Sequence, residues 1–234
     1  MDLFEALALR AGTDHSFISI TGGGGKTTLM IGFASYLRST GMKVLMTTTT
    51  KIRSPHVQDY GADKIFSDDS VLSFIPKDSC VVLYAVEDIC TGQWRCPPLG
   101  NLDVLKGIYD VVLCEADGGR GLPLKVHTQR DPVVLPFCTY TVSVMGLWGI
   151  GRIARDVAFG DETDAPVDGP YLERYLHDPE GLMKGSLPGR RALVFNGAEE
   201  AGAEYDLVRN LDYPSDVFAC TACVREGVLY EQLH

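Results

Sequence analysis

The amino-acid sequence predicts an α/β fold, with a mostly parallel sheet covered by helices on both faces. Apolar, β-rich runs alternate along the chain with segments of helical spacing, which is the pattern of such a sheet. Two of these runs, CVVLYAV at 80–86 and YDVVLCEAD at 109–117, are almost continuously apolar, as strands buried on both faces are. Four successive glycines join the first predicted strand to the first long predicted helix.

The order of the elements follows from these runs and from the turn residues between them. MDLFEALALR at the N-terminus has the spacing of a short amphipathic helix, and we expect a strand at 17–21. A helix is expected at 27–40, where Leu29, Phe33 and Leu37 recur at helical spacing, and Gly41 is placed to end it. A second strand begins at Lys43, and further strands are expected at 80–86, 109–117, 139–146, 191–197 and 216–220. The C-terminal REGVLYEQL is expected to form a hairpin with the strand before it.

We expect residues 1–234 to form a single domain. Residues 154–189 are richer in Gly, Pro and Asp than the rest of the chain, which indicates a lid or insertion with a short helix at 169–176.

Composition and charge exclude several classes of protein. The formal net charge is −10, with 21 Lys and Arg against 31 Asp and Glu, so we expect no nucleic-acid partner. The sequence has no apolar run near the roughly 20 residues of a membrane helix, and its start lacks the features of a signal peptide. Seven scattered cysteines favour a cytoplasmic protein with reduced thiols. Whether Cys220 and Cys223 have a redox or metal role stays open.

The stretch ISITGGGGKTT, residues 18–28, predicts a phosphate-binding loop. Glycine is costly to order, so four in a row indicate a backbone that bends sharply and approaches another group closely. Between a strand and a helix, glycine N–H groups can point at an anion, and the helix N-terminus adds partial positive charge. The expected phosphate ligands are Gly22, Gly23, Gly24, Gly25, Lys26, Thr27 and Thr28.

Within this loop we assign separate roles to the two side chains after the glycines. Lys26 would reach the terminal phosphates, so we expect it to be exposed in the empty loop, and Thr27 would place its hydroxyl on Mg²⁺. The spacing differs from the usual G-x-x-x-x-G-K-[ST], because Ile20 stands six positions before Lys26. The first loop glycine is therefore Gly22, and the loop is shortened.

A second group of polar residues ends the apolar run at 109–117. Ligands of open α/β sheets bind beyond the carboxyl ends of the strands, and side chains two residues apart on a strand point the same way. We therefore expect Glu115 and Asp117 beside Thr27, where they would hold Mg²⁺ and a nucleophilic water. Arg120 and Lys125 are candidates for contacts with an anionic substrate or the transferring phosphate, although solvated loop cations are the alternative.

The four threonines at 47–50 have two interpretations. Threonine suits strands, so the run can be a strand end and nothing more. Four hydroxyls beside a phosphate loop favour a functional role instead, with Thr49, Thr50 and Lys51 as the candidates.

Three blocks in this order and spacing, TGGGGKTT, TTTTKI and EADGGRGLPLK, resemble the YqeC family of selenium-dependent hydroxylase accessory proteins. RDPVVLP at 130–136, SVMGLWGIG at 143–151 and LVFNG at 193–197 extend the resemblance over nearly the whole chain. The resemblance implies a fold like that of P-loop NTPases, ATP or GTP with Mg²⁺ as cofactors, and a role in maturing molybdenum hydroxylases. It also implies that residues 22–28 hold the nucleotide phosphates, that Glu115 and Asp117 hold the metal, and that residues 47–51 face the same cleft.

Two departures from the family pattern bear on the nucleotide. Asn196-Gly197-Ala198-Glu199 stands where relatives tend to have Asn-Lys-x-Asp, so Asn196 remains as a candidate nucleotide contact without the lysine that would stack on a purine. We therefore expect weak discrimination between ATP and GTP. A His-Arg pair is expected after GLWGIG, and only Arg155 is present there.

The resemblance implies a nucleotide-hydrolysing accessory protein, whose partners are a client molybdenum hydroxylase or a factor that handles selenium or molybdopterin. Two other classes stay open. The glycine loop is also similar to that of Mur-type ATP-dependent amide ligases, although those chains are usually much longer. A non-catalytic module that uses nucleotide as a conformational switch is the third possibility.

Overall fold

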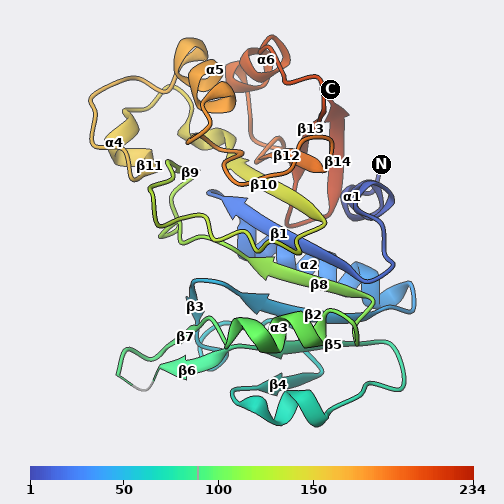
Figure 1. Ribbon diagram of the computed structural model, residues 1–234. Coiled ribbons are helices and arrows are strands. Elements are labelled where there is room, and N and C mark those ends of the chain that lie inside the picture. Colours follow the sequence, from blue (N-terminus) through green and yellow to red (C-terminus); the bar gives the residue numbers. More distant parts are fainter. Residues whose placement is uncertain (89) are drawn as a thin grey trace.

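The computed structural model describes residues 1–88 and 90–234, and within these ranges nine strands form one sheet, the main sheet (Figure 1). They are β1 (Ser16–Gly22), β2 (Lys43–Thr48), β4 (Lys64–Phe66), β5 (Cys80–Tyr84), β8 (Val111–Glu115), β10 (Tyr140–Gly146), β12 (Arg191–Asn196), β13 (Val217–Cys223) and β14 (Val228–Gln232). Their order across the sheet is β14-β13-β12-β10-β1-β8-β2-β5-β4. Neighbouring strands are parallel except β13 and β14, which are antiparallel.

This architecture confirms the predicted α/β fold class and the predicted C-terminal hairpin. Two small sheets accompany the main sheet. One pairs β9 (Leu124–Lys125) with β11 (Ala158–Phe159), and the other joins β3 (Lys51–Arg53), β7 (Gln93–Arg95) and β6 (Val86–Asp88). The helices are α1 (Leu3–Ala11), α2 (Lys26–Ser39), α3 (Leu99–Leu105), α4 (Ala154–Val157), α5 (Gly169–His177) and α6 (Ala203–Arg209), with 3₁₀ turns η1 (Asp69–Ser73) and η2 (Leu147–Gly149).

The helix ends follow from local chemistry, with one exception. The Asp2 carboxylate caps α1 by accepting from Glu5 N–H, and Asp168 caps α5 in the same way. Gly41, with φ +94°, follows the end of α2 as its position in the sequence predicts. The start of α2 has no side-chain cap. The helix begins directly after Gly25, three residues beyond the end of β1. The first N–H groups of this helix are therefore open to another partner.

Alternation along the central strands gives the main sheet two apolar faces. Ile18 and Ile20 of β1 point into a core that α1 and α2 cover, together with Phe33 and Leu37 of α2. Phe17 points the other way, into a second core beneath α3 and η1. Both faces of β1 are therefore buried. Because β1 is the middle strand of the main sheet, the loop that follows it lies at the middle of the sheet's carboxyl edge.

Residues 154–189 pack on the sheet rather than away from it. Tyr171 and Leu172 of α5 and Ala154 of α4 join Leu193 and Phe195 of β12 in one buried cluster. The predicted helix at 169–176 is α5. This segment therefore covers the face of the main sheet next to the ends of β10 and β12.

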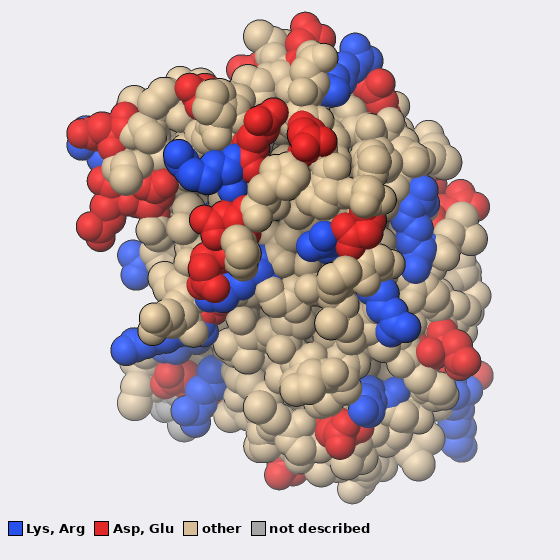
Figure 2. All heavy atoms as spheres, turned by 45° about the horizontal axis from the view of Figure 1, so that its top comes forward, with Lys and Arg blue, Asp and Glu red and all other residues tan. Residues whose placement is uncertain are grey.

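Charge is unevenly spread over the surface. Figure 2 shows acidic side chains gathered at the upper left, the side on which Figure 1 places α4 and the loop after it. That loop carries Asp161, Glu162 and Asp164.

Within the described parts of the chain, no helix has both the length and the apolar character that crossing a membrane requires.

The two ends of the chain meet beside α1. Leu3 N–H donates to Gly227 O, and Leu229 N–H donates to Met1 O. The Phe4 ring lies close to two glycines, since a Cβ on Gly32 of α2 or on Gly227 would overlap it. It also stacks on the Phe33 ring, with 6.1 Å between the two ring centroids. Gly32 thus lets α1 approach α2 closely.

We predict that Gly32→Ala destabilises the protein although alanine favours helices. Overpacking of the Phe4 ring costs about 1–3 kcal/mol, which outweighs the gain of about 0.5–1 kcal/mol in helix propensity. Gly100→Ala in α3 is the matched control, since a Cβ there meets nothing within 4 Å. Urea unfolding should show a lower free energy for Gly32→Ala and an equal or higher one for Gly100→Ala. Equal gains for both variants would show that α1 is not packed as described.

Candidate functional site

The glycine loop connects β1 to α2 at the carboxyl end of the main sheet. Gly22, Gly24 and Gly25 have φ angles of +96°, +66° and +132°, which side chains rarely adopt. A Cβ on Gly22 would overlap Val144 O, and one on Gly25 would lie 2.6 Å from the Asn196 amide nitrogen. The glycines are therefore required by the protein's own neighbouring segments as well as by backbone conformation.

The N–H groups of the loop divide into two sets. Gly22 N–H donates to Asp117 at 2.7 Å, Gly23 N–H to Val144 O at 2.9 Å and Gly24 N–H to Leu122 O at 2.9 Å. Within the described residues, the N–H groups from position 25 to position 28 have no such partner. The N–H groups of the first three glycines are therefore engaged within the protein in this structure, and those at the start of α2 are open.

Asp117 is the centre of a buried hydrogen-bonded network. Its side chain is fully buried, with Oδ2 accepting from Gly22 N–H and lying 2.7 Å from His127 Nε2, while Oδ1 lies 3.0 Å from Lys26 Nζ. His127 Nδ1 lies 2.8 Å from Gly181 O. Each ring nitrogen of His127 thus lies within hydrogen-bonding distance of an oxygen, one from Asp117 and one from the segment after α5.

Lys26 corrects one expectation from the sequence. Its side chain is 5% exposed, not open to solvent, because Nζ donates to Gly22 O at 2.6 Å and pairs with Asp117. A buried ammonium requires such partners, and the loop itself supplies them. For Lys26 to contact a phosphate, it has to exchange one of these partners for the phosphate oxygen.

Glu115 lies next to the start of α2, as expected. Thr27 Oγ1 donates to Glu115 Oε2 at 2.8 Å, and β8, which carries Glu115, pairs directly with β1. Glu115 and Asp117 therefore both contact the loop, but through different residues.

The two carboxyls have opposite electrostatic surroundings. Burial raises the pKa of Glu115 above its usual value, against the opposing effects of the Lys26 charge and the Thr27 hydrogen bond. Burial would also raise the pKa of Asp117, but the His127 hydrogen bond, the Lys26 charge and Gly22 N–H outweigh it and hold the pKa below its usual value. Asp117 is thus kept ionised, whereas Glu115 is poised nearer to protonation.

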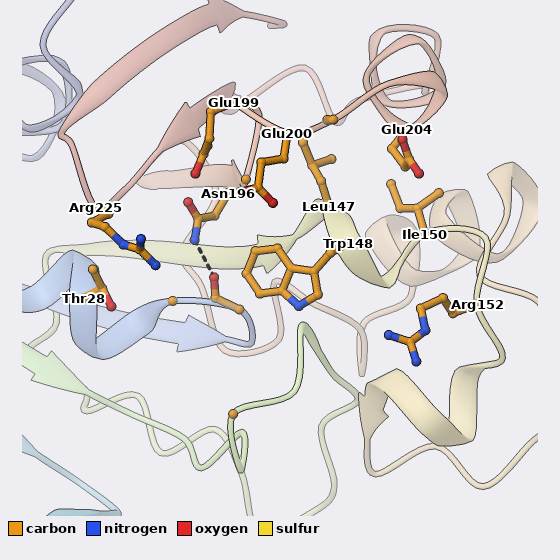
Figure 3. A pocket seen from close by; sticks show the side chains of 15 residues that line it. Thr28, Leu147, Trp148, Ile150, Arg152, Asn196, Glu199, Glu200, Glu204 and Arg225 are labelled. Carbon is orange, nitrogen blue, oxygen red and sulfur yellow. Dashed lines mark hydrogen bonds between the residues drawn. The ribbon is translucent and has the colours of Figure 1, made fainter.

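A cavity of about 640 Å³ opens beside the glycine loop (Figure 3). Asn196 links two segments beside the cavity, the glycine loop and the turn after β13. Its Nδ2 donates to Gly24 O at 2.8 Å, and its Oδ1 accepts from Val224 N–H at 2.9 Å. The described residues that line the cavity are Gly24, Gly25, Thr28, Gly121, Leu147, Trp148, Ile150, Arg152, Asn196, Gly197, Glu199, Glu200, Ala201, Glu204 and Arg225. The loop and the cavity therefore share a wall.

The two candidate cations after β8 lie in different surroundings. Lys125 is buried, with Nζ 2.5 Å from Asp131 and 4.3 Å from the centre of the Phe159 ring. It is therefore not available as a solvent-facing clamp in this structure. Arg120 is exposed, has a φ of +49°, and lies over the same ring at 4.7 Å.

The threonine run is mostly engaged within the fold. The hydroxyls of Thr47, Thr48 and Thr49 donate to the carbonyls of Tyr84, Glu115 and Val133, each at 2.8 Å. The Thr49 hydroxyl is thus engaged by the backbone of Val133 in this structure. Thr50 N–H donates to Thr48 Oγ1 at 3.0 Å, and the exposed Lys51 lies 4.0 Å from Asp88.

His127 is the site residue that sequence reasoning missed. It stands alone in the sequence, without another ligand or catalytic residue at a recognisable spacing, and only the fold brings it to Asp117.

Cys220 and Cys223, whose role the sequence leaves open, are both buried and free, and burial raises the pKa of Cys220 to about 12.

These features define a mostly parallel α/β protein with a glycine loop at an uncapped helix N-terminus and two carboxylates at the end of the adjacent strand. The family model described as YqeC protein matches residues 18–160, and the chain belongs to this family. It is similar to the uncharacterized protein YqeC of Escherichia coli (strain K12), with 29% identity over 217 residues that cover 83% of this chain and 82% of the relative. The match to the family model includes the loop, Glu115, Asp117, His127 and Trp148, whereas Asn196 lies beyond it.

We predict that neutral isosteres of the two carboxylates change stability differently. At pH 7 the ionised Asp117 stabilises the folded state, because its folded pKa is lowered, so Asp117→Asn should lower the free energy of unfolding by about 3 kcal/mol. Ionised Glu115 costs stability, because its folded pKa is raised, so Glu115→Gln should leave that free energy unchanged or higher.

Urea unfolding at pH 7, pH 4 and pH 3 measures both effects. The deficit of Asp117→Asn should shrink as the pH falls toward and below about 3.9, the value of an unperturbed aspartate. Asp103→Asn is the control, since Asp103 is 58% exposed in its pair with Lys106 and should change stability by less than about 1 kcal/mol. Equal losses for Asp117→Asn and Glu115→Gln would contradict the assignment.

Proposed function

We propose that this protein binds a purine nucleoside triphosphate with Mg²⁺ and hydrolyses it, as an accessory protein in the maturation of selenium-dependent molybdenum hydroxylases. The observation that carries the nucleotide part is the geometry of the loop. An uncapped α2 begins directly after the glycines, with Thr27 bonded to Glu115 at its first turn.

Phosphate binding at this place is supported by charge and by unpaired donors. The N–H groups at positions 25–28 and the partial positive charge of the α2 N-terminus point to the same region, which suits an anion. Lys26 is next to it and has a second partner, Gly22 O, besides Asp117. His127 and Gly22 N–H stay on Asp117 if Lys26 moves to a phosphate, so the carboxylate remains compensated.

The residues present suit Mg²⁺. Among the described residues, no group of three His, Cys, Asp or Glu gathers into a metal-binding cluster. Mg²⁺ does not require one, because it is commonly bound by one or two protein oxygens, with phosphate oxygens and waters completing the shell. Thr27 Oγ1 and Glu115 Oε2 are the oxygens that would hold it, and the ion would supply neutralising charge between the phosphates.

Glu115 and Asp117 have different tasks in this proposal. Both oxygens of Asp117 are engaged by Lys26, Gly22 and His127, so Asp117 positions the loop and Lys26. Glu115 has one bonded oxygen and a raised pKa, which suits a carboxylate that also orients or deprotonates an attacking water.

The role in hydroxylase maturation is supported by the family alone. The three sequence blocks that resemble the YqeC family fall on the loop after β1, the turn after β2 and the turn after β8, which meet at the candidate site. A client hydroxylase, or a factor that handles selenium or molybdopterin, is the partner this resemblance implies. We place the protein in the cytoplasm on the same basis and on its free cysteines.

We predict that Lys26→Met weakens nucleotide binding by about tenfold or more, because a charge-assisted hydrogen bond is worth about 1.5–3 kcal/mol. The variant should also lose stability, by less than the about 3–5 kcal/mol of a broken isolated pair, since Asp117 keeps its hydrogen bonds with His127 and with Gly22 N–H. Titration calorimetry with ATP and GTP, at a temperature where circular dichroism shows the variant folded, measures this effect. Lys106→Met, at a solvent-exposed pair, is the control. Equal affinities for wild type and Lys26→Met would remove the phosphate-loop assignment.

We predict that Glu115→Gln keeps nucleotide binding but loses most Mg²⁺-dependent turnover. The amide keeps the bond from Thr27 but lacks the charge that the metal and the proton transfer require. Single-turnover hydrolysis of ATP and GTP across a magnesium titration measures the loss.

Glu173→Gln, an exposed position on α5, is the control and should behave as wild type. Asp117→Asn should also lose turnover, together with the stability that Glu115→Gln retains. If Glu115→Gln hydrolyses at the wild-type rate at every magnesium concentration, Glu115 has no catalytic role. Stoichiometric nucleotide binding without turnover in the wild type, with a client present, would favour the switch instead.

A further inference from the structure

Trp148 occupies an unusual position in the cavity beside the glycine loop. It lies in η2, immediately after β10, and 47% of its surface is exposed. Among the described residues that line the cavity it is the one aromatic side chain. Figure 3 shows the indole beside the loop backbone, below Asn196. A half-exposed aromatic ring that lines a cavity next to a loop that suits phosphate offers a flat apolar surface to a ligand.

Two glycines leave the space that the ring occupies. A Cβ on Gly146 would lie 2.7 Å from two atoms of the six-membered ring, and one on Gly197 would lie 3.0 Å from a third. Gly146 ends β10 and Gly197 follows β12, so the ring is held between the ends of two adjacent strands. Trp148 thus packs closely on the backbone at two strand ends and keeps an open surface.

Asn196 connects this ring to the phosphate loop. Its bond to Gly24 O and its bond from Val224 N–H join the loop to the turns after β12 and β13. The cavity volume of about 640 Å³ lies within the range of small-molecule sites, roughly 300–1,000 Å³. A single ligand can therefore have an anionic group at the start of α2 and a flat group on Trp148.

We propose that Trp148 is the stacking surface for the base of the nucleotide whose phosphates the glycine loop holds. This inference rests on the proposed function and adds the subsite for the base. Stacking uses the π-face that every base has, so it tolerates different bases. The indole lies against Gly197 just after β12, next to Asn196, which bonds to the loop.

The polar rim of the cavity does not select one purine. Glu199, Glu200 and Glu204 lie on the wall opposite Trp148, with Arg225 near Thr28 and Arg152 at the other end (Figure 3). Glu199 and Glu200 are exposed to solvent and Glu204 is half-buried, and the rim offers both donors and acceptors. Adenine and guanine should therefore bind with affinities within about tenfold of each other.

Titration calorimetry with ATP, GTP and inorganic tripolyphosphate tests this subsite, because tripolyphosphate has no base. Trp148→Ala should weaken ATP and GTP binding by about tenfold or more and leave tripolyphosphate binding unchanged. Trp148→Phe, which keeps an aromatic ring, should recover part of the affinity, whereas Trp148→Leu should not.

Fluorescence gives a second measurement that does not depend on altering Trp148. The chain has two tryptophans, and Trp94 is 5% exposed in the core, so Trp94→Phe leaves Trp148 as the single indole. ATP and GTP should quench its emission, and tripolyphosphate should not.

Three outcomes would overturn the inference. Unchanged nucleotide affinity in Trp148→Ala would show that the base does not contact the ring. Equal losses for nucleotides and tripolyphosphate would show that Trp148 only maintains the loop. In both cases the wild type still binds nucleotide, and the proposed function survives. If the wild type binds none of the three ligands, the proposed function and this inference fail together.

Discussion

The ionised carboxylate of Asp117 is the constraint on which the site depends. A fully buried charge costs several kcal/mol unless it is paired and hydrogen-bonded. Lys26, His127 and Gly22 N–H provide this compensation, and His127 is held in turn by Gly181 O. One side chain thus joins the end of β8, the glycine loop, the first residue of α2 and the segment after α5. The shape of the loop follows from the position of this charge.

The same network separates two carboxylates that the sequence places two residues apart. Asp117 is held ionised because its partners outweigh burial, whereas burial dominates at Glu115 and raises its pKa. Pairs of carboxyls with pKa values pushed in opposite directions are typical of sites that need one fixed charge and one group able to exchange a proton. The arrangement gives a physical reason for assigning positioning to Asp117 and water or metal chemistry to Glu115.

Close backbone packing joins the loop to the neighbouring cavity. Gly22 and Gly24 pack against the end of β10, which continues into the turn that carries Trp148. Asn196 adds hydrogen bonds from the end of β12 to the loop and to the turn after β13. Because close-packed interiors transmit strain, contacts that a ligand makes at the loop and contacts that it makes in the cavity would not be independent.

The sequence by itself determined the α/β class, most strand and helix positions, the C-terminal hairpin and the location of the glycine loop. These follow from apolar periodicity and from glycine chemistry, which act over a few residues. It also placed Glu115 and Asp117 beside the loop, because strand ends of a parallel sheet meet at one edge. Tertiary structure alone decided that Lys26 is buried, that Thr49 and Lys125 are engaged elsewhere, and that His127 and Trp148 belong to the site. Thr49 bonds to Val133, 84 residues away, and His127 contacts Asp117 and Gly181, 10 and 54 residues away. No local sequence pattern encodes contacts over such separations.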